Sequence, residues 1–269
     1  MPAPFPPANK RLGQHFLIDQ NIVRKIIAAA ELAPDETVLE IGPGRGILTD
    51  ALSRAARRVV AIEIDAELCA LLQVRQTDWK NVEVICADAL IHPFETLPAG
   101  VVVANLPYYI STPLLFKVLE QRRRFPRLVL MLQNEVADRL VAKAGDADYG
   151  VLSVMMQYAA DVRKAFKVSA NCFRPRPDVG SAVVVVRPRP EAMLPPHEEP
   201  AFTALVKAAF AHRRKTLVNS LRDEGYKAPI VTEAVAAMKL VPTVRAETLT
   251  LEQFMELTGQ LLRATSPDA

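Results

Sequence analysis

The stretch that decides the fold is residues 37–52, which read Thr-Val-Leu-Glu-Ile-Gly-Pro-Gly-Arg-Gly-Ile-Leu-Thr-Asp-Ala-Leu. Its first five residues predict a short buried strand, and the three closely spaced glycines that follow predict a tight turn. The apolar spacing from residue 47 onward predicts a helix. A strand that runs through a glycine turn into a helix is typical of a nucleotide-binding βαβ unit, because glycines let a ligand approach the backbone closely.

A second predicted strand, residues 58–65, ends in acidic side chains. Its Glu63 lies twenty-one positions after Gly42, which is the separation expected for a carboxylate that binds ribose hydroxyls. The glycine turn reads Gly-x-Gly-x-Gly, whereas dinucleotide-binding folds carry Gly-x-Gly-x-x-Gly. S-adenosylmethionine contains an adenosine but no phosphate, so the compact turn favours this cofactor. A nicotinamide-dependent oxidoreductase is the alternative that the spacing disfavours.

The next two predicted strands also end in polar residues. Residues 82–89 end in Asp88 and the small Ala89, which suit the adenine amino group of the cofactor. A turn or N-cap role is an equally good interpretation of Asp88 alone. Residues 101–104 are aliphatic and lead into Asn-Leu-Pro-Tyr at residues 105–108 and then into the start of a helix. Ligands of α/β proteins bind at such strand ends.

The Asn-Leu-Pro-Tyr segment combines groups that suit methylation of adenine. Adenine N6 is a weak nucleophile because its lone pair is delocalised into the ring. The Asn105 side-chain oxygen and the Leu106 carbonyl can accept its two hydrogens, and Pro107 restrains Leu106 to an extended conformation. Tyr108 offers a stacking surface for a base taken out of its stack. Because an Asn-x-Pro turn after a strand is often only a turn, these four residues are catalytic candidates only in the context of the upstream cofactor motifs.

The rest of the chain predicts an α/β domain followed by a helical one. Three more strands are expected, which gives seven in a layer sandwich with a mostly parallel sheet and one antiparallel edge strand. A proline-rich linker follows, and the residue pattern after it is typical of helices. The predicted domains are residues 1–188, with a flexible arm at 1–9, and a small all-α domain at 189–269. The further strands and helices are expected at residues 127–133, 162–168, 182–186, 201–210, 216–222, 230–238 and 250–262.

Charge and cysteine content limit the possible partners. The net charge is only +3, but arginines and lysines cluster, which indicates either solvated faces or a discontinuous phosphate-binding surface. The three cysteines show no Cys-x-x-Cys spacing, so we expect reduced thiols with neither a disulfide nor a metal site. Neither a signal peptide nor a membrane span is evident in the sequence, so we expect a cytoplasmic protein without a membrane partner.

Taken in order, the motifs resemble those of the KsgA/RsmA-type ribosomal RNA adenine dimethyltransferases over nearly the whole chain. Each motif is weak alone, but the ordered set is specific. The matching segments are residues 10–17, 40–44, 62–65, 88–89, 105–108, 133–136, 149–150, 173–177 and 210–215.

The resemblance implies a Rossmann-like class I S-adenosylmethionine-dependent methyltransferase. It would transfer two methyl groups to N6 of each of two neighbouring adenosines, in a hairpin loop near the 3′ end of 16S rRNA within an immature small subunit. The product would be S-adenosylhomocysteine, and we expect a monomer. The implied cofactor-binding residues are Gln14, His15, Leu17, Gly42, Gly44, Glu63, Ile64, Asp88, Ala89 and Asn105.

The same resemblance implies which residues contact RNA. Asn105, Leu106 and Tyr108 would hold the target base, and Phe173 would stack on its other face. The basic run Arg213, Arg214 and Lys215 would bind the RNA more widely. Two positions depart from the pattern of many relatives, which carry Asn where His15 and Tyr109 stand here.

Three alternatives remain beside this interpretation. One is the related class that dimethylates an adenosine of large-subunit RNA and confers macrolide resistance, against which the segment 210–217, Phe-Ala-His-Arg-Arg-Lys-Thr-Leu, argues. Another is a non-catalytic ribosome assembly factor, against which the intact Asn-Leu-Pro-Tyr segment argues. Methylation at cytosine C5 would need a nucleophilic cysteine, and Cys172 has no motif around it and is interpreted as structural.

Overall fold

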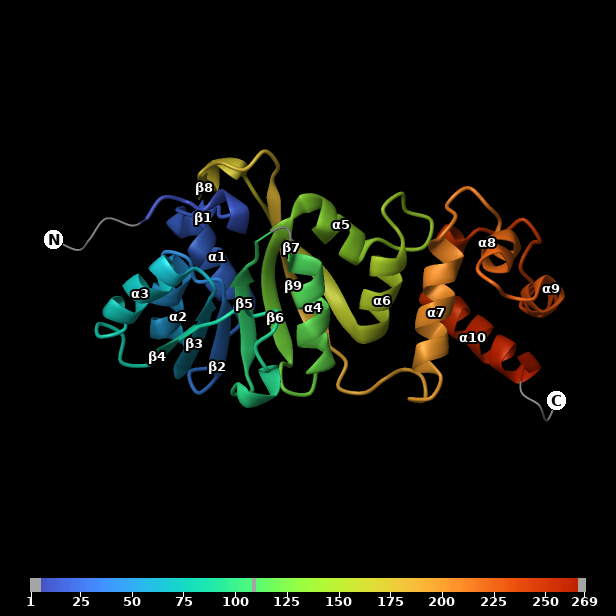
Figure 1. Cartoon of the computed structure of the whole chain (residues 1–269), viewed down its shortest axis with the longest axis horizontal. Coiled ribbons are helices and arrows are strands. Elements are labelled where there is room, and N and C mark those ends of the chain that lie inside the picture. The colour runs from blue at the N-terminus through green and yellow to red at the C-terminus, as the bar shows by residue number, and fades with distance from the viewer. Residues whose placement is uncertain (1–5, 108–109, 266–269) are drawn as a thin grey trace. The chain divides into compact units, whose positions relative to one another are not determined.

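The computed structural model describes residues 6–107 and 110–265. Within them, seven strands form one sheet in the order β4-β3-β2-β5-β6-β9-β7 (Figure 1). Neighbouring strands from β4 to β6 are parallel, whereas β9 runs antiparallel to β6. The predicted mixed sheet is therefore confirmed, with the antiparallel strand β9 one place in from the edge and β7 outermost. The strands are β2 (Thr37–Ile41), β3 (Arg58–Glu63), β4 (Val82–Cys86), β5 (Val101–Asn105), β6 (Arg127–Gln133), β7 (Ala160–Val168) and β9 (Ser181–Pro188).

The burial of the central strands explains why they could be predicted from the sequence. Every residue of β2 is buried, and residues 101–104 of β5 are at most 2% exposed. A parallel strand covered on both faces is a continuous aliphatic run, since neither face meets water. On one face of the sheet, alternate strand residues pack against α1 (Gln20–Ala30) and α2 (Ile47–Ala55) in a single hydrophobic core.

Two helices in this part of the chain, α1 and α3 (Ala66–Arg75), begin at an aspartate cap. The Asp19 side chain accepts hydrogen bonds from the backbone N–H groups of Asn21 and Ile22 at 2.8 and 3.2 Å and so caps the start of α1. Asp65 caps α3, a helix that the sequence analysis did not predict, in the same way. The remaining elements of this part are α4 (Ser111–Glu120), which follows β5, and the short helices η1 (Lys10–Leu12), η2 (Phe94–Thr96) and η3 (Ala170–Cys172).

A second, two-stranded sheet ties the N-terminal segment to a late loop. Strand β1 (Phe16–Leu17) pairs antiparallel with β8 (Phe173–Arg174), so that Leu17 lies opposite Phe173. Neither strand was predicted, because two residues are too few to show a period of two. The pairing places the Phe173 ring in the hydrophobic core, where it is 1% exposed.

The described chain falls into two compact units, one of residues 1–137 and 161–190, the other of residues 138–160 and 191–269. The second unit is helical, as predicted, and residues 138–160 group with it although the sequence analysis placed them in the first domain. Its core contains Phe202 and Phe254, and the Tyr149 hydroxyl donates a 2.9 Å hydrogen bond to the Leu249 carbonyl. Its helices are α6 (Val151–Ala159), α7 (Glu199–Phe210), α8 (Leu217–Asp223), α9 (Ala228–Ala237), η4 (Ala246–Thr248) and α10 (Leu251–Thr265), and α5 (Asn134–Val141) begins in the first unit.

One expectation about the cysteines is wrong. Cys69 and Cys86 are joined by a disulfide, with their Cα atoms 5.8 Å apart, whereas Cys172 is free. Helix α3 packs against β4 and brings the two cysteines together. A separation of 17 residues carries no sequence signal of that contact. None of the described helices is long and apolar enough to cross a bilayer.

The close packing of β2 against the start of β5 gives a testable consequence. A Cβ on Gly100 would lie 2.1 Å from the Thr37 carbonyl oxygen, which is a backbone clash that no rotamer change can relieve. We expect Gly100→Ala to lower the free energy of unfolding by about 3 kcal/mol, measured by urea denaturation. In the same unit, Gly180→Ala places its Cβ at an ordinary 3.5 Å contact and should leave the midpoint nearly unchanged. Equal midpoints for both variants would contradict the packing described here.

Candidate functional site

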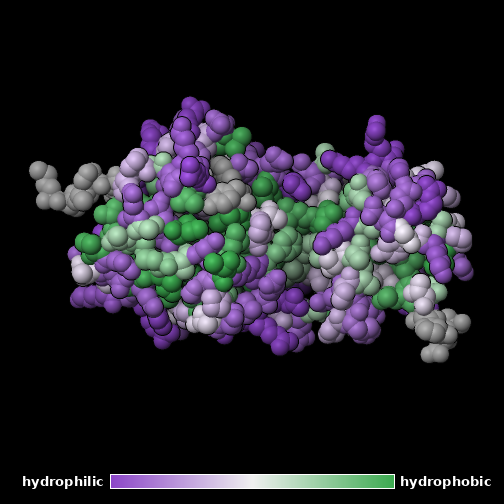
Figure 2. Space-filling view, viewed as in Figure 1, coloured by the Kyte–Doolittle hydropathy of each residue, from purple (hydrophilic) through white to green (hydrophobic). Residues whose placement is uncertain are grey.

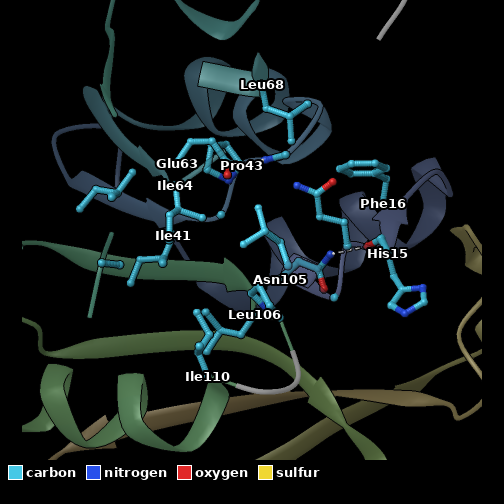
Figure 3. A pocket seen from close by; sticks show the side chains of 18 of the residues that line it. His15, Phe16, Ile41, Pro43, Glu63, Ile64, Leu68, Asn105, Leu106 and Ile110 are labelled. Atoms are coloured by element: carbon cyan, nitrogen blue, oxygen red, sulfur yellow. Dashed lines mark hydrogen bonds between the residues drawn. The ribbon is translucent and has the colours of Figure 1, made fainter. Parts of the chain in front are cut away.

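A cavity lies where the carboxyl ends of β2, β3 and β5 meet the N-terminal segment (Figure 3). All ten residues that the sequence analysis assigned to cofactor binding line it, together with Leu106 and Pro107. The structure therefore brings together, in one place, groups that are as far as 91 positions apart in sequence, from Gln14 to Asn105. Phe16 and Arg45 also line the cavity, although sequence reasoning gave them no role.

The glycine loop owes its shape to backbone angles that favour glycine. Gly44 has a φ of 57°, and its N–H donates a 3.0 Å hydrogen bond to Glu63 Oε2. A Cβ at this position would also come within 3.1 Å of the Phe16 ring. Both the left-handed conformation and the close approach of the ring thus require glycine here.

Both carboxylate oxygens of Glu63 accept backbone hydrogen bonds. Glu63 is 4% exposed, and its Oε1 accepts the Asp65 N–H at 2.9 Å while its Oε2 accepts the Gly44 N–H. Burial raises the pKa of its carboxyl, and these two backbone hydrogen bonds oppose that rise. The next residue, Ile64, is 46% exposed and offers the cavity an apolar side chain beside the carboxylate.

Glu40 is a buried carboxyl to which sequence reasoning gave no role. It is 1% exposed on β2, just before the glycine loop, and its Oε2 accepts a 2.7 Å hydrogen bond from the Thr49 hydroxyl. Its Oε1 is buried without a hydrogen-bond partner. Burial, with the nearby charges of Glu63 and Asp50 adding to it, raises the pKa of Glu40 to about 8. The signal in the sequence was a single acid inside an otherwise apolar strand.

Asp88 makes the turn contact that one of its two interpretations predicts, and its position leaves the cofactor role as a prediction. Its Oδ1 accepts the Leu90 N–H at 2.8 Å, as a turn aspartate does, and the residue also lines the cavity together with Ala89. Lys117 of α4 stabilises the turn, because its ammonium donates hydrogen bonds to the carbonyls of Leu90 and His92 at 2.6 and 2.7 Å. Sequence reasoning missed Lys117, because nothing in the helix pattern indicates this contact.

The N-terminal segment closes one side of the cavity through its backbone and through Gln14. The Gln14 amide donates a 2.7 Å hydrogen bond to Asp65 Oδ2. The His15 ring lies away from Glu63 and its Nδ1 is 2.9 Å from the Pro175 carbonyl, whereas the His15 carbonyl accepts a 3.3 Å hydrogen bond from Asn105 Nδ2 (Figure 3). The backbone of His15, rather than its imidazole, therefore contacts the polar centre of the site.

Asn105 is the last residue of β5, and its side chain is directed toward the N-terminal segment (Figure 3). Because its Nδ2 is bonded to the His15 carbonyl, its Oδ1 is the atom of the amide that can accept a hydrogen from a ligand. Leu106 is 2% exposed, lines the cavity and donates its N–H to the Met131 carbonyl at 3.2 Å. Tyr108 and Tyr109 lie outside the described residues.

The predicted RNA contacts are not all available. The Phe173 ring is buried by the β1–β8 pairing and does not line the cavity, so in this structure it cannot stack on a base. In the helical unit, Arg213, Arg214 and Lys215 are exposed just before α8, and Lys215 forms an ion pair with Asp223. Figure 2 shows hydrophilic side chains gathered over α8 and the segment before it.

Comparison with known proteins gives consistent matches over most of the chain. A family model described as ribosomal RNA adenine dimethylase matches residues 7–261. The chain is 43% identical to ribosomal RNA small subunit methyltransferase A of Moorella thermoacetica, over 94% of this chain and 92% of that protein. It is 44% identical to the protein of the same name from Levilactobacillus brevis, over 94% of this chain and 89% of that protein.

Two solved structures are similar over nearly the whole chain. A dimethyladenosine transferase from Plasmodium falciparum has a TM-score of 0.78 at 29% identity, and the match covers 93% of this chain and 98% of that one. The 23S rRNA methyltransferase ErmE has a TM-score of 0.72 at 29% identity, covering 91% of this chain and 99% of that one.

The buried Glu40 predicts a pH dependence of stability. In the unfolded chain it ionises near its ordinary pKa of 4.5, whereas in the folded chain it keeps its proton up to about pH 8. Between these values the folded state binds more protons, so this group's contribution to the free energy of unfolding falls as the pH rises, by up to about 1.4 kcal/mol per pH unit. We expect Glu40→Gln to remove this slope and to be more stable than the parent chain at pH 8, measured by urea denaturation from pH 5 to 8.

The exposed Glu120, at the end of α4, provides the matched control. Glu120→Gln should follow the pH dependence of the parent chain. If Glu40→Gln and the parent chain lost stability in parallel over this range, Glu40 would not be the protonated buried group described here.

Proposed function

The chain belongs to the ribosomal RNA adenine dimethylase family, and we propose that it methylates N6 of two adjacent adenosines in the 3′-terminal hairpin loop of 16S rRNA, dimethylating each. The observation that carries this proposal is the position of Asn105. Its amide lies at the end of β5, on the wall of the cavity that the glycine loop, Glu63 and Asp88 also line. The proposed acceptor for the base and the residues proposed for the cofactor would therefore share one cavity.

The residues present fit S-adenosylmethionine as the methyl donor. Glu63 is held by backbone N–H groups at the position that suits ribose hydroxyls, Ile64 supplies an apolar surface beside it, and Asp88 supplies an acceptor for the adenine amino group. Gln14, His15, Leu17, Gly42, Gly44 and Ala89 would complete the walls. When bound, the cofactor supplies an electrophilic methyl carbon on a sulfonium sulfur.

The chain's own contribution to transfer is orientation of the base. Asn105 Oδ1 and the Leu106 carbonyl would each accept one N6 hydrogen, which directs the nitrogen lone pair out of the ring plane. Pro107 restrains the backbone of Leu106, and Tyr108 would carry the stacked base. A strong general base is not needed, because the nitrogen becomes acidic once it is methylated. Positioning of this kind can account for most of the acceleration.

The RNA would be bound more widely by the helical domain, proposed as residues 189–269, through Arg213, Arg214 and Lys215. No stacking role is proposed for Phe173, since its ring would first have to leave the core. We propose that the protein acts as a cytoplasmic monomer on the immature small subunit. The large-subunit alternative is less favoured, because the relatives of 40–44% identity are named as small-subunit methyltransferases.

The direct test is transfer of labelled methyl groups from S-adenosylmethionine to ribosomal particles that lack the modification. We expect dimethylation of two neighbouring adenosines in small-subunit particles, located by mass spectrometry of RNA fragments, and no transfer to large subunits. Label on large-subunit RNA alone would support the alternative class, and no label on either would contradict the proposed activity.

Asn105→Ala should lower kcat by about 100-fold, by analogy with the loss of one fixed polar group at a reacting centre. Binding of the RNA should change little, because most of its affinity would come from phosphate contacts elsewhere. The exposed Asn21 on α1 is the matched control, and Asn21→Ala should retain full activity. Full methylation by Asn105→Ala would refute the role given to this amide.

A further inference from the structure

A cluster of three side chains, Arg75, Asp50 and Trp79, contacts the glycine loop without lining the cavity. The Arg75 guanidinium, at the end of α3, donates from Nη2 to both carboxylate oxygens of Asp50, at 2.9 Å each. The Trp79 indole N–H donates to Asp50 Oδ1 at 2.8 Å, and the Arg75 guanidinium lies 4.8 Å from the Trp79 ring centroid. Asp50 and Trp79 thus fix the plane of the guanidinium from two directions.

The remaining contact of this guanidinium is with the glycine loop itself. Arg75 Nη1 donates a 2.9 Å hydrogen bond to the Arg45 carbonyl. The contact is tight, because a Cβ on Gly46 would lie 3.0 Å from Arg75 Nη1 and 3.3 Å from the Trp79 ring. None of the three cluster residues lines the cavity, whereas the glycine loop that Arg75 contacts does.

The glycine loop contacts several residues that line the cavity, so a change in the position of the loop would move them. Its Gly44 N–H holds Glu63, and the Arg45 guanidinium lies 4.3 Å from the Phe16 ring centroid. Arg45 Nη2 also donates to the Pro6 carbonyl at 3.2 Å. A shift of the Arg45 peptide would therefore disturb both the carboxylate proposed to bind ribose and the N-terminal segment.

We propose that Arg75, held by Asp50 and Trp79, is a positioning residue that fixes the glycine loop in the conformation that binds the cofactor. The inference rests on the proposed S-adenosylmethionine site. Asn105 and Leu106 line the cavity and Arg75 does not, so its loss acts on cofactor affinity and leaves the transfer step of the bound complex unchanged.

Arg75→Lys tests this role while keeping the positive charge beside Asp50. A lysine ammonium is a point charge and lacks the planar fork needed to bind Asp50 and the Arg45 carbonyl together. We expect the Kd for S-adenosylhomocysteine, measured by isothermal titration calorimetry on the full chain, to rise about 10-fold, which is the loss expected for about one hydrogen bond. The KM for S-adenosylmethionine should rise in parallel, with kcat within about twofold of the parent value.

The matched control is Arg58, at the start of β3, whereas Glu63 is at its end. Arg58 forms an exposed 2.5 Å ion pair with Glu83. Arg58→Lys should leave Kd, KM and kcat within about twofold of the parent chain. If Arg75→Lys does not fold, Trp79→Phe, which removes the indole donor to Asp50 and part of the ring that stacks on Arg75, should still raise Kd about threefold with kcat unchanged.

The outcomes separate the two proposals. Failure of the parent chain to bind S-adenosylhomocysteine would refute the cofactor site itself. If the parent chain binds it, a rise in Kd with unchanged kcat supports the role of Arg75. An Arg75→Lys variant with the Kd of Arg58→Lys, or one that loses kcat at saturating cofactor while Kd is unchanged, would overturn that role.

Discussion

The rest of the site depends on one buried interaction, the hydrogen bond from the Gly44 N–H to the Glu63 carboxylate. It joins the turn after β2 to the end of β3, and the second oxygen of the same carboxylate is taken by the Asp65 N–H. A carboxylate that is 4% exposed would be costly to bury if it were unpaired, so these backbone donors are what allow an acid at this depth. Its position in turn defines where we propose that the ribose of the cofactor binds.

A second set of contacts joins the residues that we propose for the cofactor to the residue that we propose for the target base. The N-terminal segment is tied to β8 by strand pairing, to Asp65 by Gln14, and to Asn105 through the His15 carbonyl. The side chain that we propose for the target base is thus oriented by the same segment that lines the cofactor cavity. This shared wall is why we propose that the amide at the end of β5 belongs to a methyl-transfer site.

The central sheet and the glycine turn could be predicted from the sequence, because the central strands are continuous aliphatic runs and the turn has one compact spacing. All ten predicted cofactor residues line one cavity for this reason. The contacts that could not be predicted are those made between distant elements by residues with no local signal. Three contacts are of this kind. They are the two-residue β1–β8 pairing that buries Phe173, the disulfide between Cys69 and Cys86, and the hydrogen bond from Arg75 to the glycine loop.

The central claim is that this cavity binds the methyl donor through Glu63 and Asp88, beside Asn105. A crystal structure of the full chain with S-adenosylhomocysteine tests it most directly. We expect ribose hydroxyls within hydrogen-bond distance of the Glu63 carboxylate, the adenine amino group at Asp88, and the sulfur facing Asn105. A product molecule bound elsewhere, or one in the cavity whose ribose does not contact Glu63, would contradict it.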